Sequence, residues 1–519
     1  MTDRHTNVPD FLLEGKDPSR IALRPLNKEH SYGELQAATD AVASYIAASG
    51  CQKGDRAVLV SDNSLFWVAA YLGILRAGLV CVPLPPGIPA QELDYVLEAT
   101  APRIILAQSS FALRNFASRG EGRLGLHLVT DHRCRPLPNL LSQTSFAELT
   151  VGSSHALSPL PTISPNDLAA LMFTSGSTGK PRGVMVSHRN IMANTESIVQ
   201  YLGLTANDRV MTVLPFHYCF GTSLLHTHLR CGAELVLDPR FMYPEAILER
   251  MLATECTGFA GVPSHFQILL RNSSLRKKSF PHLRYVQQAG GHLAPAFIRE
   301  LQQALPQTEI FIMYGQTEAT ARLSYLPPAF LDTKLGSIGN GIPGVELRIL
   351  DETGGEVSPG QVGEIVAEGH NVALGYWPCG STSEDSASPF RDGKLYTGDL
   401  ATLDADGFIY VVDRAKDFVK CGGKRVSCRQ IEDQLLECEE VLEAAVIGVP
   451  DEVLGEAVKA FVVPRVADGN GLKESLHQFC KKNMPPPLVP REIALLTSLP
   501  KNSSGKVLKQ RLKNSDQAV

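Results

Sequence analysis

Short apolar runs that alternate with segments of helical periodicity constrain the fold of this 519-residue chain more than any other feature of its sequence. In the helical segments apolar residues recur at every third or fourth position, whereas the runs between them are apolar almost throughout. Strands that alternate with helices in this way form α/β layers around a largely parallel sheet. The fold class predicted is therefore α/β, with a large N-terminal domain of layered α/β subdomains. The predicted strands of this domain lie at 55–61, 80–84, 103–107, 209–214, 235–237, 258–262, 283–289 and 309–314.

The pattern changes in the last third of the chain. From 336 to 412, short β-like runs alternate with turns rich in Gly, Asp and Pro, which predicts a small β-rich, antiparallel subdomain. A charged segment follows, and then a compact α+β piece with helices predicted at 428–436 and 472–482. We therefore predict two domains, 1–413 and 414–519.

Composition and charge exclude several classes of function. The chain has 49 Lys and Arg residues against 54 Asp and Glu residues, a net charge of −5, which argues against a general nucleic-acid or membrane-surface binder. It has no membrane-spanning apolar run and no signal pattern at its N-terminus, so we predict a cytoplasmic protein. Eleven cysteines are scattered without a Cys-x-x-Cys pair, so neither a zinc site nor a disulfide framework is expected. The Pro- and Ser-rich stretch 136–166 is predicted to be a surface connection.

The segment that follows the apolar run 168–173 has the composition of a phosphate-binding loop. Glycines let backbone N–H groups turn towards an anion, hydroxyls donate hydrogen bonds, and a lysine supplies positive charge. Only two residues separate Gly176 from Gly179 and Pro181 follows the lysine, so this is not the P-loop of kinases and GTPases. A second apolar run follows, so the loop should join strand to strand. The candidate phosphate ligands are Thr174, Ser175, Gly176, Ser177, Thr178, Gly179 and Lys180.

Three other polar segments are ambiguous when each is taken alone. Residues 314–318, Tyr-Gly-Gln-Thr-Glu, end a predicted strand, and their threonine and glutamate would suit a magnesium–triphosphate or be incidental. Asp399, in the turn 396–400, could bind two ribose hydroxyls or simply belong to a β-turn. Residues 501–506, Lys-Asn-Ser-Ser-Gly-Lys, could hold a catalytic cation or form a solvated basic tail.

Together and in this order, the four stretches resemble the adenylate-forming superfamily, which includes acyl-CoA synthetases, adenylation domains of peptide synthetases and beetle luciferases. The resemblance covers residues 31–511. It implies that 1–413 binds AMP and the acyl group, and that 414–519 is a mobile domain. It also implies the reaction. A carboxylate and ATP, with Mg²⁺, give acyl-AMP and pyrophosphate, and the acyl group then passes to coenzyme A or to the phosphopantetheine of a carrier protein acting in trans.

The resemblance assigns roles to individual residues. Thr174 to Lys180 would hold the β- and γ-phosphates, Thr317 would touch the α-phosphate, and Glu318 would bind Mg²⁺. Asp399 would bind the ribose hydroxyls with help from Arg414. Lys506 matches the catalytic lysine and Lys416 the hinge. The residues implied to line the adenine and its neighbouring turn are Gly290, Gly291, Tyr314, Gly315 and Gln316, and those implied to line the thiol tunnel are Gly422 and Gly423.

The acyl pocket is where the resemblance leaves most open. Its implied walls are Phe220, Gly221, Leu224, Val262 and Met313, and its polar candidates are His217, His265, Gln287 and Arg322. His217 resembles the mobile histidine of acyl- and aryl-CoA ligases, and it stands where amino-acid adenylation domains usually carry an aspartate. Arg322 could meet a second carboxylate of the substrate, although an ion pair within the protein is the more expected interpretation.

A carboxylic acid–thiol ligase is therefore the predicted function. A stand-alone amino-acid-adenylating enzyme that loads a carrier protein is the main alternative. A luciferase-type oxygenase and a non-catalytic nucleotide-binding protein are two others. Neither the acid nor the oligomeric state can be read from the sequence.

Overall fold

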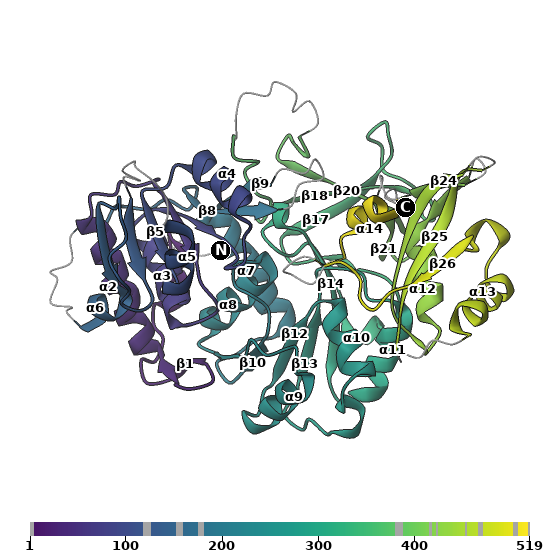
Figure 1. The fold of residues 1–519 in the computed structure, drawn as a ribbon, viewed down its shortest axis with the longest axis horizontal. Coiled ribbons are helices and arrows are strands. Elements are labelled where there is room, and N and C mark those ends of the chain that lie inside the picture. Colours follow the sequence, from purple (N-terminus) through teal and green to yellow (C-terminus); the bar gives the residue numbers. More distant parts are fainter. Residues whose placement is uncertain are drawn as a thin grey trace.

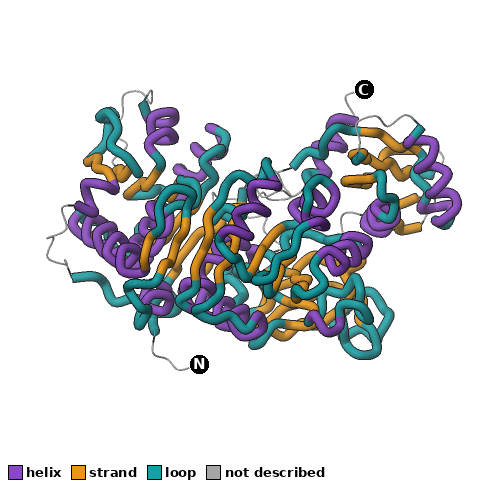
Figure 2. Tube along the Cα trace, turned by 90° about the horizontal axis from the view of Figure 1, so that it is seen from below, coloured by secondary structure: helices purple, strands orange, loops and turns teal. Residues whose placement is uncertain are grey.

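The computed structural model describes residues 5–117, 126–151, 159–174, 181–378, 388–414, 418–421, 424–451, 454–465, 471–501 and 507–516. The chain forms two large α/β bodies, a small β-rich subdomain and a C-terminal α/β body. In Figure 1 the first body lies at the left, the second in the lower centre, the β-rich subdomain above it and the C-terminal body at the right. In the perpendicular view of Figure 2, helices flank the strands of the N-terminal sheets, and the C-terminal strands form a separate group. The mixed α/β class with a large N-terminal and a small C-terminal part is confirmed. No helix in the described parts of the chain is both long and apolar enough to cross a membrane.

The first body is a seven-stranded sheet in the order β7-β6-β5-β3-β4-β8-β9, parallel except for the β8–β9 pair. Its central strands are buried at nearly every position, as expected where helices cover both faces. The strands are β3 (Arg56–Val60), β4 (Val80–Pro83), β5 (Ile104–Ala107), β6 (His127–Thr130), β7 (Ser142–Ser145), β8 (Leu168–Thr174) and β9 (Arg182–Ser187). The helices are α2 (Tyr32–Ala48), α3 (Leu65–Arg76), α4 (Ala90–Thr100), α5 (Ser109–Phe116) and α6 (Phe146–Val151).

Two sequence predictions are decided in this body. The loop after Phe173 does join strand to strand, because β8 and β9 pair in antiparallel fashion with Thr174 opposite Arg182. The prediction that 136–166 is only a surface connection is wrong, because β7 and α6 lie within it. The strand β7 reads Ser-Gln-Thr-Ser and lies at the sheet edge, where backbone pairing with β6 suffices and no apolar pattern is required.

The second body is a nine-stranded sheet in the order β16-β15-β14-β13-β12-β10-β11-β1-β2. Its central strands are parallel, so their carboxyl ends share one edge. The strands are β1 (Ile21–Arg24), β2 (His30–Ser31), β10 (Arg209–Thr212), β11 (Glu234–Leu237), β12 (Gly258–Gly261), β13 (Tyr285–Gln288), β14 (Glu309–Tyr314), β15 (Ser324–Leu326) and β16 (Asn340–Gly341). The helices are α1 (Val8–Leu13), α7 (His188–Leu202), α8 (Cys219–Cys231), α9 (Pro244–Ala253), α10 (Pro263–Arg271) and α11 (Pro295–Ala304), with short 3₁₀ turns at Leu275–Lys277, Thr317–Ala319 and Pro328–Phe330.

The β-rich subdomain is antiparallel, as predicted. Its strands are β17 (Val345–Leu350), β18 (Gly363–Gly369), β19 (Phe390–Arg391), β20 (Lys394–Leu403) and β21 (Ile409–Arg414). The C-terminal body has a sheet of β22 (Phe418–Cys421), β23 (Lys424–Ser427), β24 (Val441–Asp451), β25 (Gly455–Pro464) and β26 (Glu492–Leu495), with α12 (Cys428–Leu436), α13 (Leu472–Asn483), a 3₁₀ turn at Pro486–Leu488, and α14 (Lys509–Asp516).

The C-terminal body packs against α10 and α11 of the second body. Side chains from both parts, among them Phe266 and Ile431, belong to one apolar cluster. The guanidinium of Arg271 on α10 is buried at this contact and donates to the carbonyls of Leu436 at 3.3 Å, Cys438 at 3.5 Å and Val441. An apolar cluster and the polar bonds of Arg271 therefore both hold the two parts together.

Candidate active site

The segment after β14 folds back sharply on itself. A Cβ atom on Gly315 would lie 2.0 Å from the carbonyl oxygen of Ala321, so only glycine fits there. The N–H of Leu323 donates to the carbonyl of Tyr314 at 2.9 Å and closes the fold. Thr317 and Glu318 therefore lie on a short rigid turn at the carboxyl edge of the sheet, the edge where α/β proteins bind ligands.

Three residues predicted to bind the nucleotide meet beside this turn. The hydroxyl of Tyr314 donates to Asp399 Oδ2 at 2.6 Å, and Arg414 Nε donates to Asp399 Oδ1 at 3.1 Å. Asp399 and Arg414 lie opposite each other on β20 and β21. Burial, followed by the charge of Asp399, raises the pKa of the Tyr314 hydroxyl, so the hydroxyl stays a donor at neutral pH. Each carboxylate oxygen keeps a further lone pair with which it can accept hydrogen bonds.

Glu318 has a partner that the sequence did not single out for a role. The hydroxyl of Tyr376 donates to Glu318 Oε1 at 2.8 Å, and the guanidinium of Arg182 lies 5.2 Å from the Tyr376 ring centroid. Arg182 is the first residue of β9 and lies opposite Thr174. The two ends of the predicted phosphate loop are thus held beside Glu318. The only signal for Tyr376 in the sequence was the Gly-Tyr pair at 375–376, whose residue types do not specify this contact.

The turn after β13 contains Gly290 and Gly291, so no side chain covers its backbone there. Gly290 has φ +83°, and a Cβ there would lie 2.9 Å from Val262 Cγ1. A Cβ on Gly291 would lie 3.2 Å from Pro263 Cγ. Both glycines therefore let this turn approach the start of α10 closely.

His217 precedes α8 and is partly buried. Its Nε2 atom is buried and has no hydrogen-bond partner among the described residues. Burial lowers its pKa to about 4, so the ring is uncharged at pH 7. Gly221, four residues later, packs so tightly that a Cβ would lie 2.1 Å from the carbonyl oxygen of Pro215. Gly221 is therefore needed for the path of the chain into α8.

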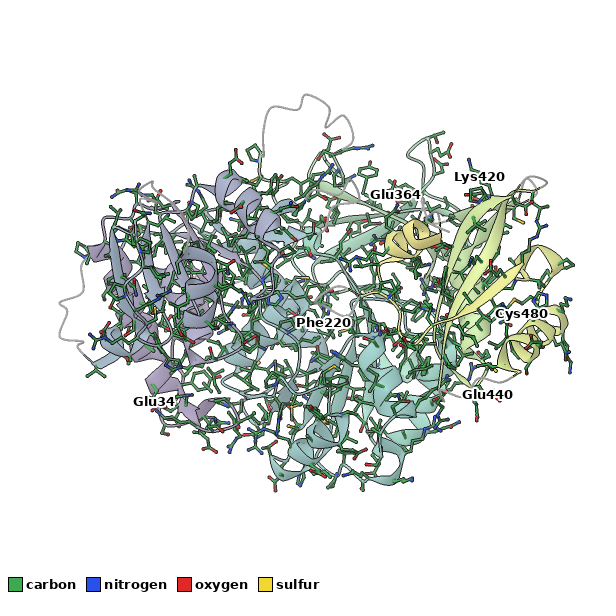
Figure 3. The ribbon with its side chains drawn as sticks, viewed as in Figure 1. Glu34, Phe220, Glu364, Lys420, Glu440 and Cys480 are labelled. Atoms are coloured by element: carbon green, nitrogen blue, oxygen red, sulfur yellow. The ribbon has the colours of Figure 1, made fainter. Side chains whose placement is uncertain are left out.

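The predicted acyl walls do come together. Phe220, Leu224, Val262 and Met313 belong to one apolar cluster between the sheet and the helices α7 and α8. Phe220 lies near the middle of the molecule (Figure 3). His265, by contrast, packs on Phe241 with ring centroids 4.1 Å apart and accepts a hydrogen bond from the Val262 N–H at 3.4 Å through Nδ1. His265 therefore has a structural role at the start of α10.

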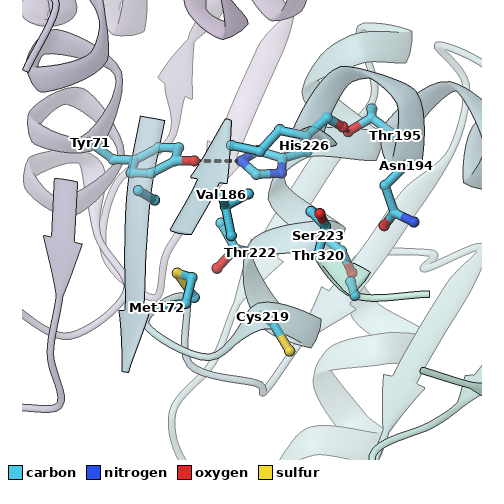
Figure 4. A pocket seen from close by; sticks show the side chains of 13 residues that line it. Tyr71, Met172, Val186, Asn194, Thr195, Cys219, Thr222, Ser223, His226 and Thr320 are labelled. Atoms are coloured by element: carbon cyan, nitrogen blue, oxygen red, sulfur yellow. Dashed lines mark hydrogen bonds between the residues drawn. The ribbon is translucent and has the colours of Figure 1, made fainter. Parts of the chain in front are cut away.

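Arg322 was expected to form an ion pair within the protein. Among the described residues this expectation is wrong, because no carboxylate pairs with it. Arg322 is 1% exposed, and its guanidinium lies 4.0 Å from the centroid of the Phe220 ring. A small cavity adjoins this region (Figure 4). Its lining includes Cys219 and Thr320, as well as Tyr71 and His226, which are joined by a 2.9 Å hydrogen bond between the Tyr71 hydroxyl and His226 Nε2.

Several predicted residues lie outside the described part of the chain. They are Ser175, Gly176, Ser177, Thr178, Gly179, Lys180, Lys416, Gly422, Gly423 and Lys506. The described residue that precedes 502–506 is Lys501, whose Nζ atom lies 2.6 Å from Glu443 Oε1. Burial and, to a lesser degree, the charge of Lys501 lower the pKa of His265 to about 4.

Comparison with known proteins agrees with this arrangement. Residues 14–377 match the family model of the AMP-binding enzyme, and residues 430–506 match that of the AMP-binding enzyme C-terminal domain. A long-chain-fatty-acid–CoA ligase of Escherichia coli O157:H7 is 30% identical over 99% of this chain and 95% of its own length. A 3-[(3aS,4S,7aS)-7a-methyl-1,5-dioxo-octahydro-1H-inden-4-yl]propanoyl:CoA ligase of Rhodococcus jostii is 31% identical over 91% of both chains.

Solved structures are similar over almost the whole chain. The o-succinylbenzoate CoA synthetase of Bacillus subtilis, in complex with its acyl-adenylate intermediate, has a TM-score of 0.83 at 28% identity over 98% of each chain. Another structure of that enzyme contains ATP and a magnesium ion and has a TM-score of 0.81. The fold and the site thus define an adenylate-forming enzyme, and the chain belongs to the AMP-binding enzyme family. It is an ATP-dependent ligase that joins a carboxylic acid to a thiol through an acyl-adenylate.

Proposed function

We propose that this protein converts a carboxylic acid and coenzyme A into an acyl-CoA thioester while ATP is cleaved to AMP and pyrophosphate. The observation that carries the proposal is the convergence of Tyr314 and Arg414 on Asp399, beside the turn that bears Glu318. The names of the curated relatives support coenzyme A, rather than a carrier protein, as the thiol. They do not favour the amino-acid-adenylating alternative. The cytoplasmic location stays a prediction.

The nucleotide would lie across the ends of β13, β14 and β20. Asp399 would accept hydrogen bonds from the ribose hydroxyls through its remaining lone pairs. The bare backbone at 290–291 and the ring of Tyr314 would enclose the adenine. Thr317 would donate to the α-phosphate, and 174–180 would hold the β- and γ-phosphates through backbone N–H groups, hydroxyls and Lys180.

Magnesium fits the site as an ion shared with the triphosphate. No group of three or more Asp, Glu, His or Cys side chains that could hold a metal occurs among the described residues, so an all-protein cage is absent there. Mg²⁺ usually binds through one or two carboxylates together with phosphate oxygens and water. Glu318 would supply the carboxylate through Oε2, because Oε1 already accepts from Tyr376. Bound there, the ion would neutralise part of the phosphate charge.

The chain's own residues would serve the first step by countering charge. A carboxylate oxygen attacks the α-phosphorus, the bond to the bridging β-phosphate oxygen breaks, and pyrophosphate leaves with the electron pair. Two anions meet, so the barrier is largely electrostatic. Lys506 would donate to the oxygens on which charge builds up. His217, held neutral by burial, would orient the acyl carboxylate by hydrogen bonding without adding a charge.

The second step requires a different position of the C-terminal domain. The thiolate attacks the acyl carbon and AMP leaves, so the acyl group must face a thiol rather than Lys506. We place the domain boundary between 413 and 414 and the hinge at Lys416. Gly422 and Gly423 would line the passage for the pantetheine arm, because glycine lets a narrow chain pass close to the backbone. His292, next to the turn 290–291, contacts Asp433 of the C-terminal domain at 2.7 Å, which supports the present arrangement as the one that forms the adenylate.

The test is ATP–pyrophosphate exchange with a panel of fatty, aryl, dicarboxylic and amino acids, followed by thioester detection with coenzyme A. We expect exchange with at least one non-amino acid and a thioester in the presence of coenzyme A. Exchange with amino acids alone would support the alternative instead. ATP binding without exchange for any acid would refute the ligase assignment.

A further inference from the structure

Buried polar atoms without partners concentrate around the predicted acyl pocket. Among the described residues, twelve buried side-chain nitrogen or oxygen atoms lack a hydrogen-bond partner, and six of them lie in this region. Buried polar groups in folded proteins are nearly always paired, so such a concentration marks a place where partners arrive with a ligand. The six atoms are Ser197 Oγ, His217 Nε2, Gln287 Nε2 and Oε1, Gln316 Nε2, and Arg322 Nη2.

Arg322 is the member of this group with a full charge. Its Nη2 has no partner, its Nη1 reaches the carbonyl of Ala321 at 3.5 Å, and its Nε reaches the sulfur of Met313 at 3.4 Å. The guanidinium also interacts with the neutral hydroxyl of Tyr201. No carboxylate of the described residues forms an ion pair with it. A guanidinium carries five N–H donors in a planar fork that matches a carboxylate. The fork of Arg322 is therefore buried with almost all of this capacity unused.

The contact with Phe220 does not replace an anion. The ring attracts the guanidinium from 4.0 Å, but it accepts no in-plane hydrogen bonds from the fork. The surrounding cluster is otherwise apolar, formed by side chains such as Leu224 and Met313. Removing a charge from water into such surroundings is unfavourable unless an opposite charge and hydrogen bonds compensate. The geometry thus requires an anion that the described protein does not provide.

Two neutral side chains with unpaired polar atoms, Gln287 and Ser197, lie beside the same apolar cluster as Met313. Gln287 is paired in the sheet with Phe311, so both side chains are on the face that Met313 and the apolar cluster share. Ser197 lies on α7 between Asn194, whose Nδ2 donates to the Arg322 carbonyl at 3.1 Å, and Tyr201, whose hydroxyl contacts Met313 Sδ at 3.0 Å. An amide and a hydroxyl therefore accompany the guanidinium.

Three aromatic rings pack beside these polar groups. Tyr201 and Tyr325 stack with centroids 4.2 Å apart, and Phe311 packs against both. Because Tyr201 and Arg322 both contact Met313 Sδ, this stack packs beside Arg322 and favours a compact acid over a long unbranched chain.

We infer that the acyl substrate is a compact dicarboxylic acid, whose second carboxylate is bound by Arg322 with Gln287 and Ser197 as further donors. This inference rests on the proposed ligase function and names its substrate class. One carboxylate would react at the α-phosphate, and the other would accept two parallel N–H bonds from the guanidinium fork. A monocarboxylic acid of equal length would leave the fork unpaired, and a site that loses such bonds discriminates strongly.

The test is pyrophosphate exchange with acids matched in length. The pairs are succinate with butyrate, glutarate with pentanoate, and adipate with hexanoate, and hexadecanoate is added as a long-chain acid. We expect kcat/KM for the best dicarboxylate to exceed that of its partner by about 100-fold or more. Arg322→Met should abolish this ratio, and Arg322→Lys, which keeps the charge without the fork, should restore part of it. Arg348→Met, which removes an exposed arginine from β17, should leave the ratio unchanged.

The outcomes separate this inference from the function on which it rests. Exchange that prefers monocarboxylates or hexadecanoate would overturn the inference and leave the ligase intact. An equal loss of both acids of a pair in Arg322→Met, with no change in their ratio, would also overturn it. Failure of every acid to support exchange would instead overturn the proposed function. Thermal unfolding without substrate provides a second readout. Arg322→Met should keep or raise the midpoint, whereas a structural ion pair at Arg322 would make it fall.

Discussion

Replacing Arg271 by methionine should uncouple the two half-reactions. The guanidinium is 2% exposed and bridges Glu300 on α11, at 2.6 Å, to three carbonyls of the C-terminal domain. Methionine has a similar length and keeps the packing on Phe297, whose ring centroid lies 4.1 Å from the guanidinium carbon. The substitution therefore removes the bonds across the interface and changes little of its shape.

The size of the effect follows from those bonds. A hydrogen bond from a charged donor contributes about 1.5–3 kcal/mol, and the bonds to Leu436 and Cys438 are long, so we set the loss at about 2–4 kcal/mol. Because 1.4 kcal/mol is a factor of ten, the population of the present domain arrangement should fall by about 30- to 700-fold relative to any other. When the domains separate in the wild-type protein, Arg271 keeps its ion pair with Glu300 and forms hydrogen bonds with water. Arg271 therefore does not destabilise the separated arrangement.

Two reaction rates measure this change in the population of the domain arrangement. Pyrophosphate exchange, which is proposed to need this arrangement, should fall in Arg271→Met, whereas thioester formation from supplied acyl-adenylate should be unchanged or faster. Arg299→Met is the matched control, because Arg299 is 45% exposed and pairs across the same interface with Glu437, a contact that should contribute only about 0.5 kcal/mol. If both half-reactions fall equally in Arg271→Met, the reasoning is refuted.

Three other predictions follow from the same geometry. Tyr314→Phe should raise the KM for ATP by about tenfold, because Asp399 loses a charge-assisted bond; Tyr410→Phe, outside the site, is the control, and an unchanged KM would count against the ribose assignment. Lys506→Ala should abolish adenylate formation but spare thioester formation from acyl-adenylate, so loss of both would contradict the two-position scheme. Burial lowers the pKa of His217 to about 4 and that of His226 to about 3, whereas the unfolded chain titrates near 6.5. Between these pKa values the unfolded state therefore binds more protons than the folded state. The urea midpoint of unfolding should be constant above pH 7 and fall from pH 6.5 towards pH 4. A midpoint that does not change down to pH 4 would contradict the lowered pKa values of these two histidines.

The sequence predicted the elements whose side chains report burial. The strand β8, the helix α12 and the antiparallel subdomain follow patterns of apolar residues, and each was found where expected. The edge strand β7 escaped notice, because its residues are polar and only its backbone pairs with the sheet. Periodicity records which side chains are buried, and an edge strand buries few.

The site could be predicted only in part. The motifs placed Tyr314, Asp399 and Arg414 in one site from segments distant in the chain, and the structure brings them into contact. The contact between Tyr376 and Glu318 depends on how the subdomain packs on β9, which no local pattern encodes. The missing counter-ion of Arg322 is likewise a property of the packed layer around it. It becomes visible only when every neighbouring side chain is in place.

The tight fold at Gly315 makes one short turn responsible for two different tasks. The same backbone reversal carries Thr317 and Glu318, which are proposed to contact the nucleotide, and leads to Arg322, which is proposed to bind the acyl substrate. An insertion or deletion in this turn would displace the phosphate-binding groups together with the acyl-binding group. If Arg322 binds the substrate as proposed, exchanging its side chain should change the acid specificity without any change in the backbone. In protein engineering, residue 322 can therefore be substituted, whereas the length of the turn must be kept.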